Sequence, residues 1–292
     1  MTFDLVMADL AVIMSIYKND KLSVLKESVQ SILTQTFSQF HYYLILDGPV
    51  SGDIEEYISA LKDERIILFR HESNEGLATA LNVLLEKVMK NQDYKIIARM
   101  DADDISMPDR FEQQRSYLNT NPEVSIVGSW YEEIDENGKY LSHRRLPTEH
   151  SALRKRYLTR TPFAHASVMY RRELIEKAGF YPTDTILMED NILWGRALKT
   201  GLKFANIPKY LFKFRIDKNH FKRRSGLRYG WSYIRTRFSI NRSLAFPLYS
   251  YFLSLSVGLI KMIPSSLKSQ VTSASRKLYN INKWRSVYQG TI

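Results

Sequence analysis

The chain has 292 residues, of which 44% are hydrophobic, enough to bury one large core or two modest ones. It contains no cysteine, which excludes a disulfide framework, a thiolate metal site and a cysteine nucleophile. The formal net charge is +11, but residues 218–292 hold fourteen of the 42 Lys and Arg and none of the 31 Asp and Glu. The N-terminal segment MTFDLVMADL has no Lys or Arg, so we do not expect a secretory signal.

Residues 8–110 are predicted to alternate between strand and helix. Apolar runs predict strands at 11–16, 42–46, 66–69 and 95–100, and helical spacing of apolar residues predicts helices at 21–36, about 54–61 and 76–90. This order is typical of an α/β fold with a mostly parallel, doubly wound sheet.

Polar residues follow three of these strands. Tyr17 comes after the first strand, Asp47 after the second and Asp101 after the fourth. Open α/β sheets bind ligands beyond the carboxyl ends of their strands, so we expect these residues to converge on one binding site.

Three carboxylates follow the fourth strand within four residues: Asp101, Asp103 and Asp104. Crowded carboxylates repel one another, and a divalent cation relieves the repulsion. Oxygen ligands of this kind suit Mg²⁺ or Mn²⁺. An Asp-rich turn before the next helix would explain the same residues without a metal.

The C-terminal segment combines positive charge with aromatic residues. Its cations include Lys222, Arg223, Arg224, Arg228, Arg235, Arg237 and Arg242, and an apolar run follows at 244–263. Serines and Pro247 interrupt this run, whereas about 20 apolar residues are needed to span a bilayer. The pattern favours helices lying on an anionic membrane surface. A helical pair packed on the catalytic body, with a solvated basic face, is the alternative.

Five segments, in order along the chain, resemble glycosyltransferase family 2: AVIMSIYKND, LILDGPVSGD, NEGLATALN, ARMDADDISMPDRFEQQ and MEDNILWGRALKTG. The resemblance covers about residues 8–220. It is strongest to the non-processive enzymes of bacterial O-antigen, capsule and exopolysaccharide assembly, including the amylovoran type. It implies a GT-A fold. The Gln-x-x-Arg-Trp motif of the processive members is absent, so the resemblance implies transfer of a single sugar.

The resemblance implies roles for five residues at the nucleotide. Tyr17 would flank the base, Asp47 would hydrogen-bond uracil and Asn74 would belong to the loop that closes over the nucleotide. Arg99 precedes the Asp-x-Asp motif, and Asp101 would lie near the ribose. Packing at a strand end for Tyr17 and helix capping for Asn74 are the structural alternatives.

The same resemblance implies that Asp103 is the metal ligand, with Asp101 beside it and His220 as a further ligand. His165 would contact the sugar acceptor or the diphosphate. A hydrogen-bonded, half-buried histidine explains His165 equally well.

The resemblance also implies a catalytic role for Glu189 and Asp190, which precede a helix predicted at 192–199. Asp190 would be the general base that takes the proton from the attacking hydroxyl, and Glu189 its partner or substitute. Acids in a first helical turn are also stabilised by the helix dipole, which is a sufficient structural explanation.

Together these features predict a GT-A catalytic domain at 1–217, with its nucleotide part at 8–110 and its acceptor part at 111–217, followed by a basic membrane-associating region at 218–292. We expect an inverting transfer from a UDP-sugar to a polyprenyl-diphosphate-linked saccharide, with Mg²⁺ or Mn²⁺. The enzyme would be peripheral, on the cytoplasmic face of the bacterial inner membrane. A sugar nucleotidyltransferase and a non-catalytic membrane-surface adaptor are the alternatives, and no nucleic-acid partner is expected.

Overall fold

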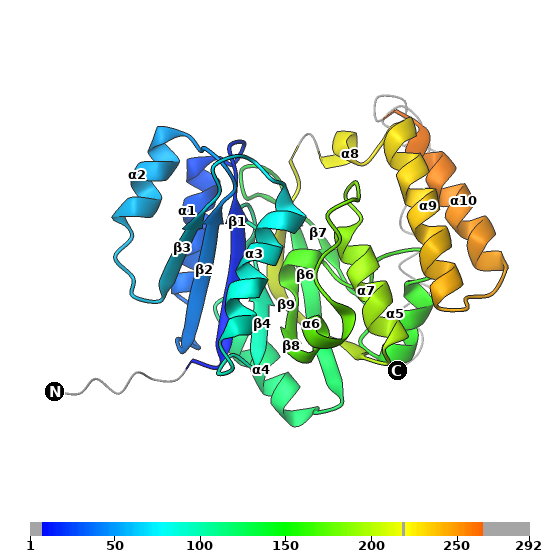
Figure 1. Cartoon of the computed structure of the whole chain (residues 1–292), viewed down its shortest axis with the longest axis horizontal. Coiled ribbons are helices and arrows are strands. Elements are labelled where there is room, and N and C mark those ends of the chain that lie inside the picture. The colour runs from blue at the N-terminus through cyan, green and yellow to red at the C-terminus, as the bar shows by residue number, and fades with distance from the viewer. Residues whose placement is uncertain (1–7, 218–219, 265–292) are drawn as a thin grey trace.

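The computed structural model describes residues 8–217 and 220–264 (Figure 1). The strands are β1 (Leu10–Ile16), β2 (Phe40–Leu46), β3 (Ile66–Arg70), β4 (Ile96–Arg99), β5 (Ile105–Ser106), β6 (Val124–Ile134), β7 (Tyr140–Arg144), β8 (Met169–Arg171) and β9 (Lys203–Arg215). The helices are α1 (Leu22–Leu33), α2 (Gly52–Ala60), α3 (Leu77–Lys90), α4 (Arg110–Thr120), α5 (His150–Arg156), α6 (Glu173–Ala178), α7 (Glu189–Lys199), α8 (His220–Arg223), α9 (Leu227–Ser243) and α10 (Tyr249–Met262), with a 3-10 turn η1 (His165–Ser167).

The strands described form one sheet in the order β3-β2-β1-β4-β8-β6-β9-β5, and β7 pairs with the outer part of β6. The four predicted strands are confirmed and run parallel to one another: β1 lies between β2 and β4, with Leu10 opposite both Phe40 and Ile96. Strand β8 lies between β4 and β6 and is antiparallel to both. Parallel pairing returns between β6 and β9.

Helices cover both faces of the sheet, and each face has its own apolar core. Alternate residues of β1 show the division: Ala11 and Ile13 belong to one core, whereas Val12 and Met14 belong to the other. The first core also takes side chains from α3, α6 and α7, and the second takes side chains from α1, α2 and α4. Burial on both faces explains why these strands read as continuous apolar runs.

The C-terminal helices α9 and α10 form a hairpin at one side of the molecule, and α9 packs against α7 (Figure 1). Ile240 and Leu244 of α9 join the first apolar core. A Cβ at Gly195 of α7 would lie 3.4 Å from Ile240 Cγ1, so the two helices are in close contact. The first core therefore continues past residue 217, and the helices pack on the body as in the alternative reading of the tail, whereas their association with a membrane stays a prediction.

Arg237 of α9 was expected to face lipid, and this expectation is wrong. The side chain is 1% exposed, and its guanidinium donates to the backbone carbonyl of Tyr157 and lies over the Tyr157 ring. Arg237 thus anchors α9 to the body. Among the helices of residues 8–217 and 220–264, none is long and apolar enough to cross a bilayer.

Candidate active site

A cavity of about 380 Å³ opens at the carboxyl ends of β1, β2 and β4, where the sequence predicted a binding site. Five of the residues predicted at the nucleotide or the metal line it: Tyr17, Asp47, Asn74, Asp101 and Asp103. Their convergence is confirmed. It follows from the parallel pairing of β1 with both β2 and β4, which brings three strand ends to one edge.

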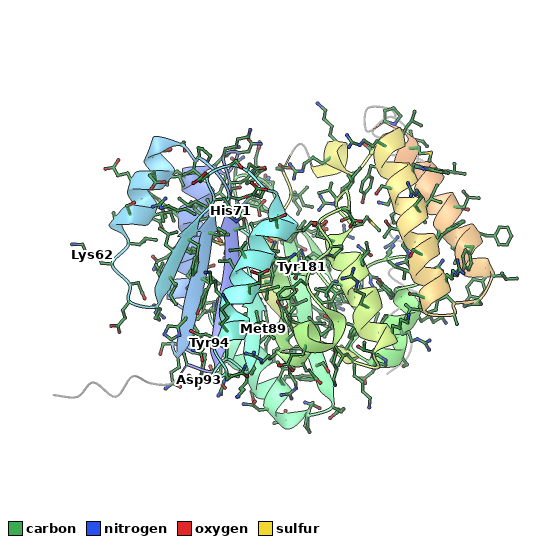
Figure 2. The ribbon with its side chains drawn as sticks, in the orientation of Figure 1. Lys62, His71, Met89, Asp93, Tyr94 and Tyr181 are labelled. Atoms are coloured by element: carbon green, nitrogen blue, oxygen red, sulfur yellow. The ribbon has the colours of Figure 1, made fainter. Side chains whose placement is uncertain are left out.

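Asp47 holds the loop at residues 71–76 against the cavity. Its side chain is 2% exposed, and its carboxylate accepts hydrogen bonds from Asn74 Nδ2, Glu75 N and Gly76 N at 2.9 Å each. His71 contacts the same carboxylate through Nδ1 at 3.0 Å (Figure 2). A carboxylate offers about four lone-pair sites, and these four donors occupy them. The contact of Asp47 with uracil stays a prediction, and it would require one of the donors to move.

Tyr17 lies at the rim of the cavity with 37% of its surface exposed. Its backbone N–H donates to Asp20 Oδ2 at 2.8 Å, and this bond fixes the turn that follows β1. Burial raises the pKa of Asp20 to about 7, and the negative charge of Asp103 adds to the rise. The exposed ring of Tyr17 is free to pack against a flat ligand.

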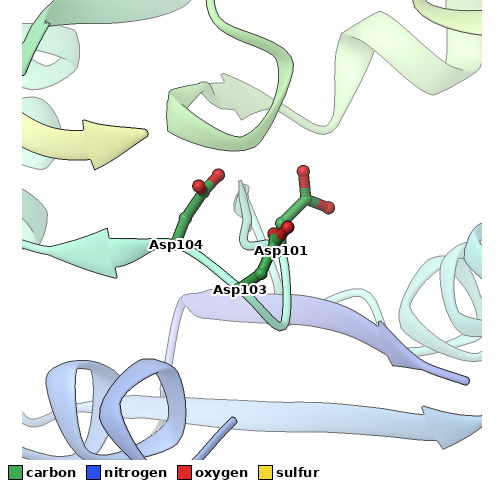
Figure 3. A group of neighbouring side chains, drawn as sticks. All are labelled: Asp101, Asp103 and Asp104. Atoms are coloured by element: carbon green, nitrogen blue, oxygen red, sulfur yellow. The ribbon is translucent and has the colours of Figure 1, made fainter. Parts of the chain in front are cut away.

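The acidic turn brings three carboxylates together (Figure 3), and two of them, Asp101 and Asp103, line the cavity. One oxygen each from Asp101, Asp103 and Asp104 lies within 4.8 Å of the others. Burial raises the pKa of Asp103 and, more strongly, that of Asp104, because the charged form is poorly solvated there.

Asp104 is the member of this group that the sequence-based assignment of metal ligands left out. It has no exposed surface, and its Oδ1 accepts the backbone N–H of Arg215 at 2.7 Å. Its Oδ2 is buried without a hydrogen-bond partner among the described residues. A buried carboxylate oxygen without a partner costs free energy unless a cation or a donor meets it. The all-oxygen group therefore fits a divalent cation.

Arg99 lies behind the cavity wall and does not line it. Its side chain has no exposed surface, and Nη1 forms an ion pair with Asp101 Oδ1. The positive charge of Arg99 also interacts with Asp103 and with Glu189. Arg99 is therefore positioned to orient Asp101 and to link the acidic turn electrostatically to α7.

Glu189 and Asp190 form the first turn of α7, which begins three residues earlier than predicted. Asp190 Oδ1 accepts hydrogen bonds from the backbone N–H of Asn191 at 2.7 Å and from Asn191 Nδ2 at 3.0 Å. Burial raises the pKa of both acids, and the charges of Arg224 and Arg99 act in the opposite direction. The two acids lie beside the cavity rather than in its lining.

Leu187, just before this turn, does line the cavity. Its φ of +54° is left-handed, a conformation that non-glycine residues seldom adopt. Backbone of this kind is found where the surrounding structure holds a site in place.

The structure describes the surroundings of one of the two histidines with a predicted role. His165 begins η1 and is half-buried, with Nε2 2.9 Å from the hydroxyl of Tyr181. Burial lowers the pKa of His165 well below its ordinary value. It does not line the cavity, so the half-buried alternative describes it. The side chain of His220 lies outside the described residues, and its metal role stays a prediction.

Arg223 and Arg224 also line the cavity, although the sequence assigned them to the membrane surface. Arg223 Nη1 lies 2.7 Å from Asp217 Oδ2, and the charge of Arg224 reaches Glu189 and Asp190. These contacts bring positive charge to the acidic site. The sequence did hold one signal for this position: the two arginines closely follow the end of β9. A segment so close to a strand end can fold back over the binding site at that edge of the sheet.

Comparison with known proteins agrees with this geometry. The model of "Glycosyl transferase family 2" matches residues 11–179. The chain is 33% identical over 233 residues to the amylovoran biosynthesis glycosyltransferase AmsE of Erwinia amylovora, covering 80% of this chain and 84% of that protein. It is 30% identical over 264 residues to UDP-Gal:alpha-D-GlcNAc-diphosphoundecaprenol beta-1,3-galactosyltransferase of Escherichia coli, covering 89% of this chain and 94% of that protein.

Solved structures share the fold. The mannosyltransferase PcManGT of Pyrobaculum calidifontis, in complex with GDP-Man and Mn²⁺, aligns with a TM-score of 0.60 at 18% identity, covering 96% of this chain and 84% of that one. TarS of S. aureus, in complex with UDP-GlcNAc, aligns with a TM-score of 0.60 at 14% identity, covering 84% of this chain and 72% of that one. The sheet and its covering helices are thus those of GT-A glycosyltransferases.

Proposed function

Because this chain belongs to glycosyltransferase family 2, we propose that it moves one sugar, with inversion, from a UDP-sugar to a polyprenyl-diphosphate-linked saccharide in the synthesis of a bacterial surface polysaccharide. The observation that carries the proposal is the acidic turn at 101–104, which lies in the mouth of a cavity at the sheet edge and is linked through Arg99 to the acids of α7. This arrangement provides a place for a diphosphate and a base close to it.

The donor would bind along the cavity. Tyr17 supplies an exposed ring at the rim for the uracil base, and the loop fixed by Asp47 forms the wall next to it. Asp101, Asp103 and Asp104 would hold Mg²⁺ or Mn²⁺, which when bound offsets the charge that develops on the leaving diphosphate. Arg223 and Arg224 bring further positive charge to the same cavity.

The base would be Asp190, with Glu189 as its partner. As the acceptor hydroxyl oxygen bonds to the anomeric carbon, the bond from that carbon to the UDP oxygen breaks and the hydroxyl proton passes to the carboxylate. Burial raises the pKa of Asp190 above its ordinary value, which makes the carboxylate a stronger base. Direct displacement from the face opposite UDP inverts the anomeric centre.

The lipid-linked acceptor is supported by the name of the Escherichia coli relative, whose substrate carries a diphosphoundecaprenol group. Helix α10 supports an attachment to the membrane surface, because it exposes a set of large apolar side chains: Leu248, Phe252, Leu255, Leu259 and Ile260. Such a face can lie among lipid headgroups at the cytoplasmic side of the inner membrane.

Incubation of the purified protein with a panel of radiolabelled UDP-sugars, Mn²⁺ and a polyprenyl-diphosphate-linked sugar tests this function. We expect one donor to label the lipid, excess EDTA to abolish labelling, and the new linkage to have the inverted configuration. Release of pyrophosphate from a nucleoside triphosphate and a sugar phosphate would instead indicate a nucleotidyltransferase. Binding of the acceptor without transfer from any donor would indicate an adaptor.

A further inference from the structure

A second cavity, of about 710 Å³, lies between α7 and α9, and the mechanism above does not use it. Arg196 and Lys199 of α7 line one side, and Arg228 and Arg235 of α9 line the other. Residues 182–186 of the loop before α7 close one end. We call this cavity the basic groove.

The cations of the basic groove form two facing rows. Arg196 and Lys199 are three residues apart on α7, whereas Arg228 and Arg235 are seven apart on α9, so each pair lies on one helical face. Asp184 is the one acid that lines the groove. Within the described ranges Lys199, Arg228 and Arg235 form no ion pair. Facing cations repel each other, and an anion bound between them would remove that cost.

Trp231 and hydroxyl side chains complete the lining. Trp231 lies between the two arginines of α9 and is 57% exposed, which is unusual for so large an aromatic ring. Ser232, Thr236 and Ser239 continue the same helical face and supply hydroxyl groups. A ligand with phosphate oxygens and a sugar ring matches this set, because Arg binds phosphate in a forked geometry and an indole packs against the apolar face of a sugar.

The basic groove is joined to the active site through one loop and one helix. Leu187 lines the first cavity, whereas Thr185 and Ile186 line the groove, so the loop forms a wall of both. Arg196 follows Asp190 by six residues on α7, which is about 9 Å along the helix axis. Arg196 and Asp190 lie on different sides of α7, so a saccharide that presents a hydroxyl to Asp190 would pass the loop at 185–187 to bring its remaining groups to the groove.

We propose that the basic groove binds the diphosphate of the lipid-linked acceptor, with Arg228 and Arg235 on the phosphate oxygens and Trp231 against the adjoining sugar. This assignment rests on the function proposed above, and it separates two anion sites: donor diphosphate at the acidic turn, acceptor diphosphate at the basic groove. It also gives a reason for an exposed tryptophan beside two arginines that form no ion pair with the described residues.

The test compares two water-soluble probes in buffer without lipid: decyl diphosphate N-acetylglucosamine and decyl N-acetylglucosaminide, which lacks the diphosphate. The double variant R228Q/R235Q should bind the diphosphate probe at least tenfold more weakly than the unchanged chain by calorimetry, and should bind the plain glycoside and UDP equally well. In transfer assays its KM for the diphosphate acceptor should rise, with kcat at saturation unchanged. The matched control is R242Q, which removes an exposed cation of α9 outside the groove.

Three outcomes decide the matter. If R228Q/R235Q binds both probes like the unchanged chain, the assignment is wrong. If it loses binding to phosphatidylglycerol vesicles but keeps the diphosphate probe, the groove serves lipid headgroups and the assignment is again wrong. If the unchanged chain transfers no sugar but binds the diphosphate probe through these arginines, the proposed function fails while the groove assignment stands.

Discussion

The role of Asp47 can be decided by one substitution, Asp47→Asn. The asparagine keeps the shape of the side chain but replaces one accepting oxygen by an NH₂ group. In the structure Oδ1 contacts His71 Nδ1 and Glu75 N, while Oδ2 accepts from Asn74 Nδ2 and Gly76 N. Whichever oxygen is replaced, two donors lose their partner and face another donor.

The expected loss of stability follows from those bonds. Hydrogen bonds to a charged group contribute about 1.5–3 kcal/mol each, so losing two corresponds to roughly 3–6 kcal/mol. The loop can relax because Glu72 to Glu75 are exposed, so we expect about 3 kcal/mol, the lower end of that range. Asn74 and Gly76 line the cavity, so release of the loop should also weaken UDP binding.

Urea unfolding and calorimetric titration with UDP measure the two effects. Glu72→Gln, an exposed change in the same loop, is the control and should alter neither. If Asp47→Asn leaves the free energy of unfolding unchanged but abolishes UDP binding, the carboxylate contacts the base directly, as the sequence-based assignment has it. If neither quantity changes, the inference that the Asp47 carboxylate holds the loop at 71–76 in place is wrong.

Four further predictions concern the acidic site and helix α10. Asp103→Asn should lower Mn²⁺-dependent turnover about 100-fold or more while the protein stays folded; undiminished turnover in excess EDTA would contradict the metal role. Asp190→Asn should lower kcat by about 10²–10⁴ with UDP affinity retained, whereas an inactive Glu189→Gln beside an active Asp190→Asn would reverse the assignment. Because burial raises the pKa of Asp190, kcat of the unchanged enzyme should fall on the acid side at a higher pH than an ordinary aspartate would give, and should be full above it; a pH–rate profile tests this. Leu255→Ser with Leu259→Ser should weaken binding to anionic vesicles about tenfold or more, with unchanged thermal unfolding, because both side chains are exposed; equal sedimentation with vesicles would exclude α10 as the lipid contact.

Much of the N-terminal half could be predicted because its signals are local. Each strand from β1 to β4 is an apolar run that ends in a polar residue, and parallel pairing then brings Tyr17, Asp47 and Asp101 to one edge. The place of strand β8 in the sheet could not be predicted, because its position between β4 and β6 depends on pairing across distant segments.

The hydrogen-bond partners of the site residues could not be predicted from the sequence either. The donors to Asp47 come from residues 24 to 29 positions further along the chain, and the backbone N–H that meets Asp104 comes from Arg215. From composition alone, the cations of the C-terminal segment were predicted to lie together on a membrane-facing surface. The fold instead divides them: Arg223 and Arg224 line the active-site cavity, and Arg237 lies in the interior.

The contact between α9 and α10 depends on two glycines. A Cβ at Gly230 would lie 2.4 Å from Met262 Cγ, and one at Gly258 would lie 2.2 Å from Ile234 Cγ1, so the two helices cannot pivot about each other without separating. Helix α9 also packs against α7, where a Cβ at Gly195 would lie 3.4 Å from Ile240 Cγ1, so α9 connects α10 to the helix whose first turn holds Asp190. If α10 rests on a bilayer, these three helices would fix the distance between the membrane surface and Asp190. That distance would limit how many sugars can separate the reacting hydroxyl from the lipid.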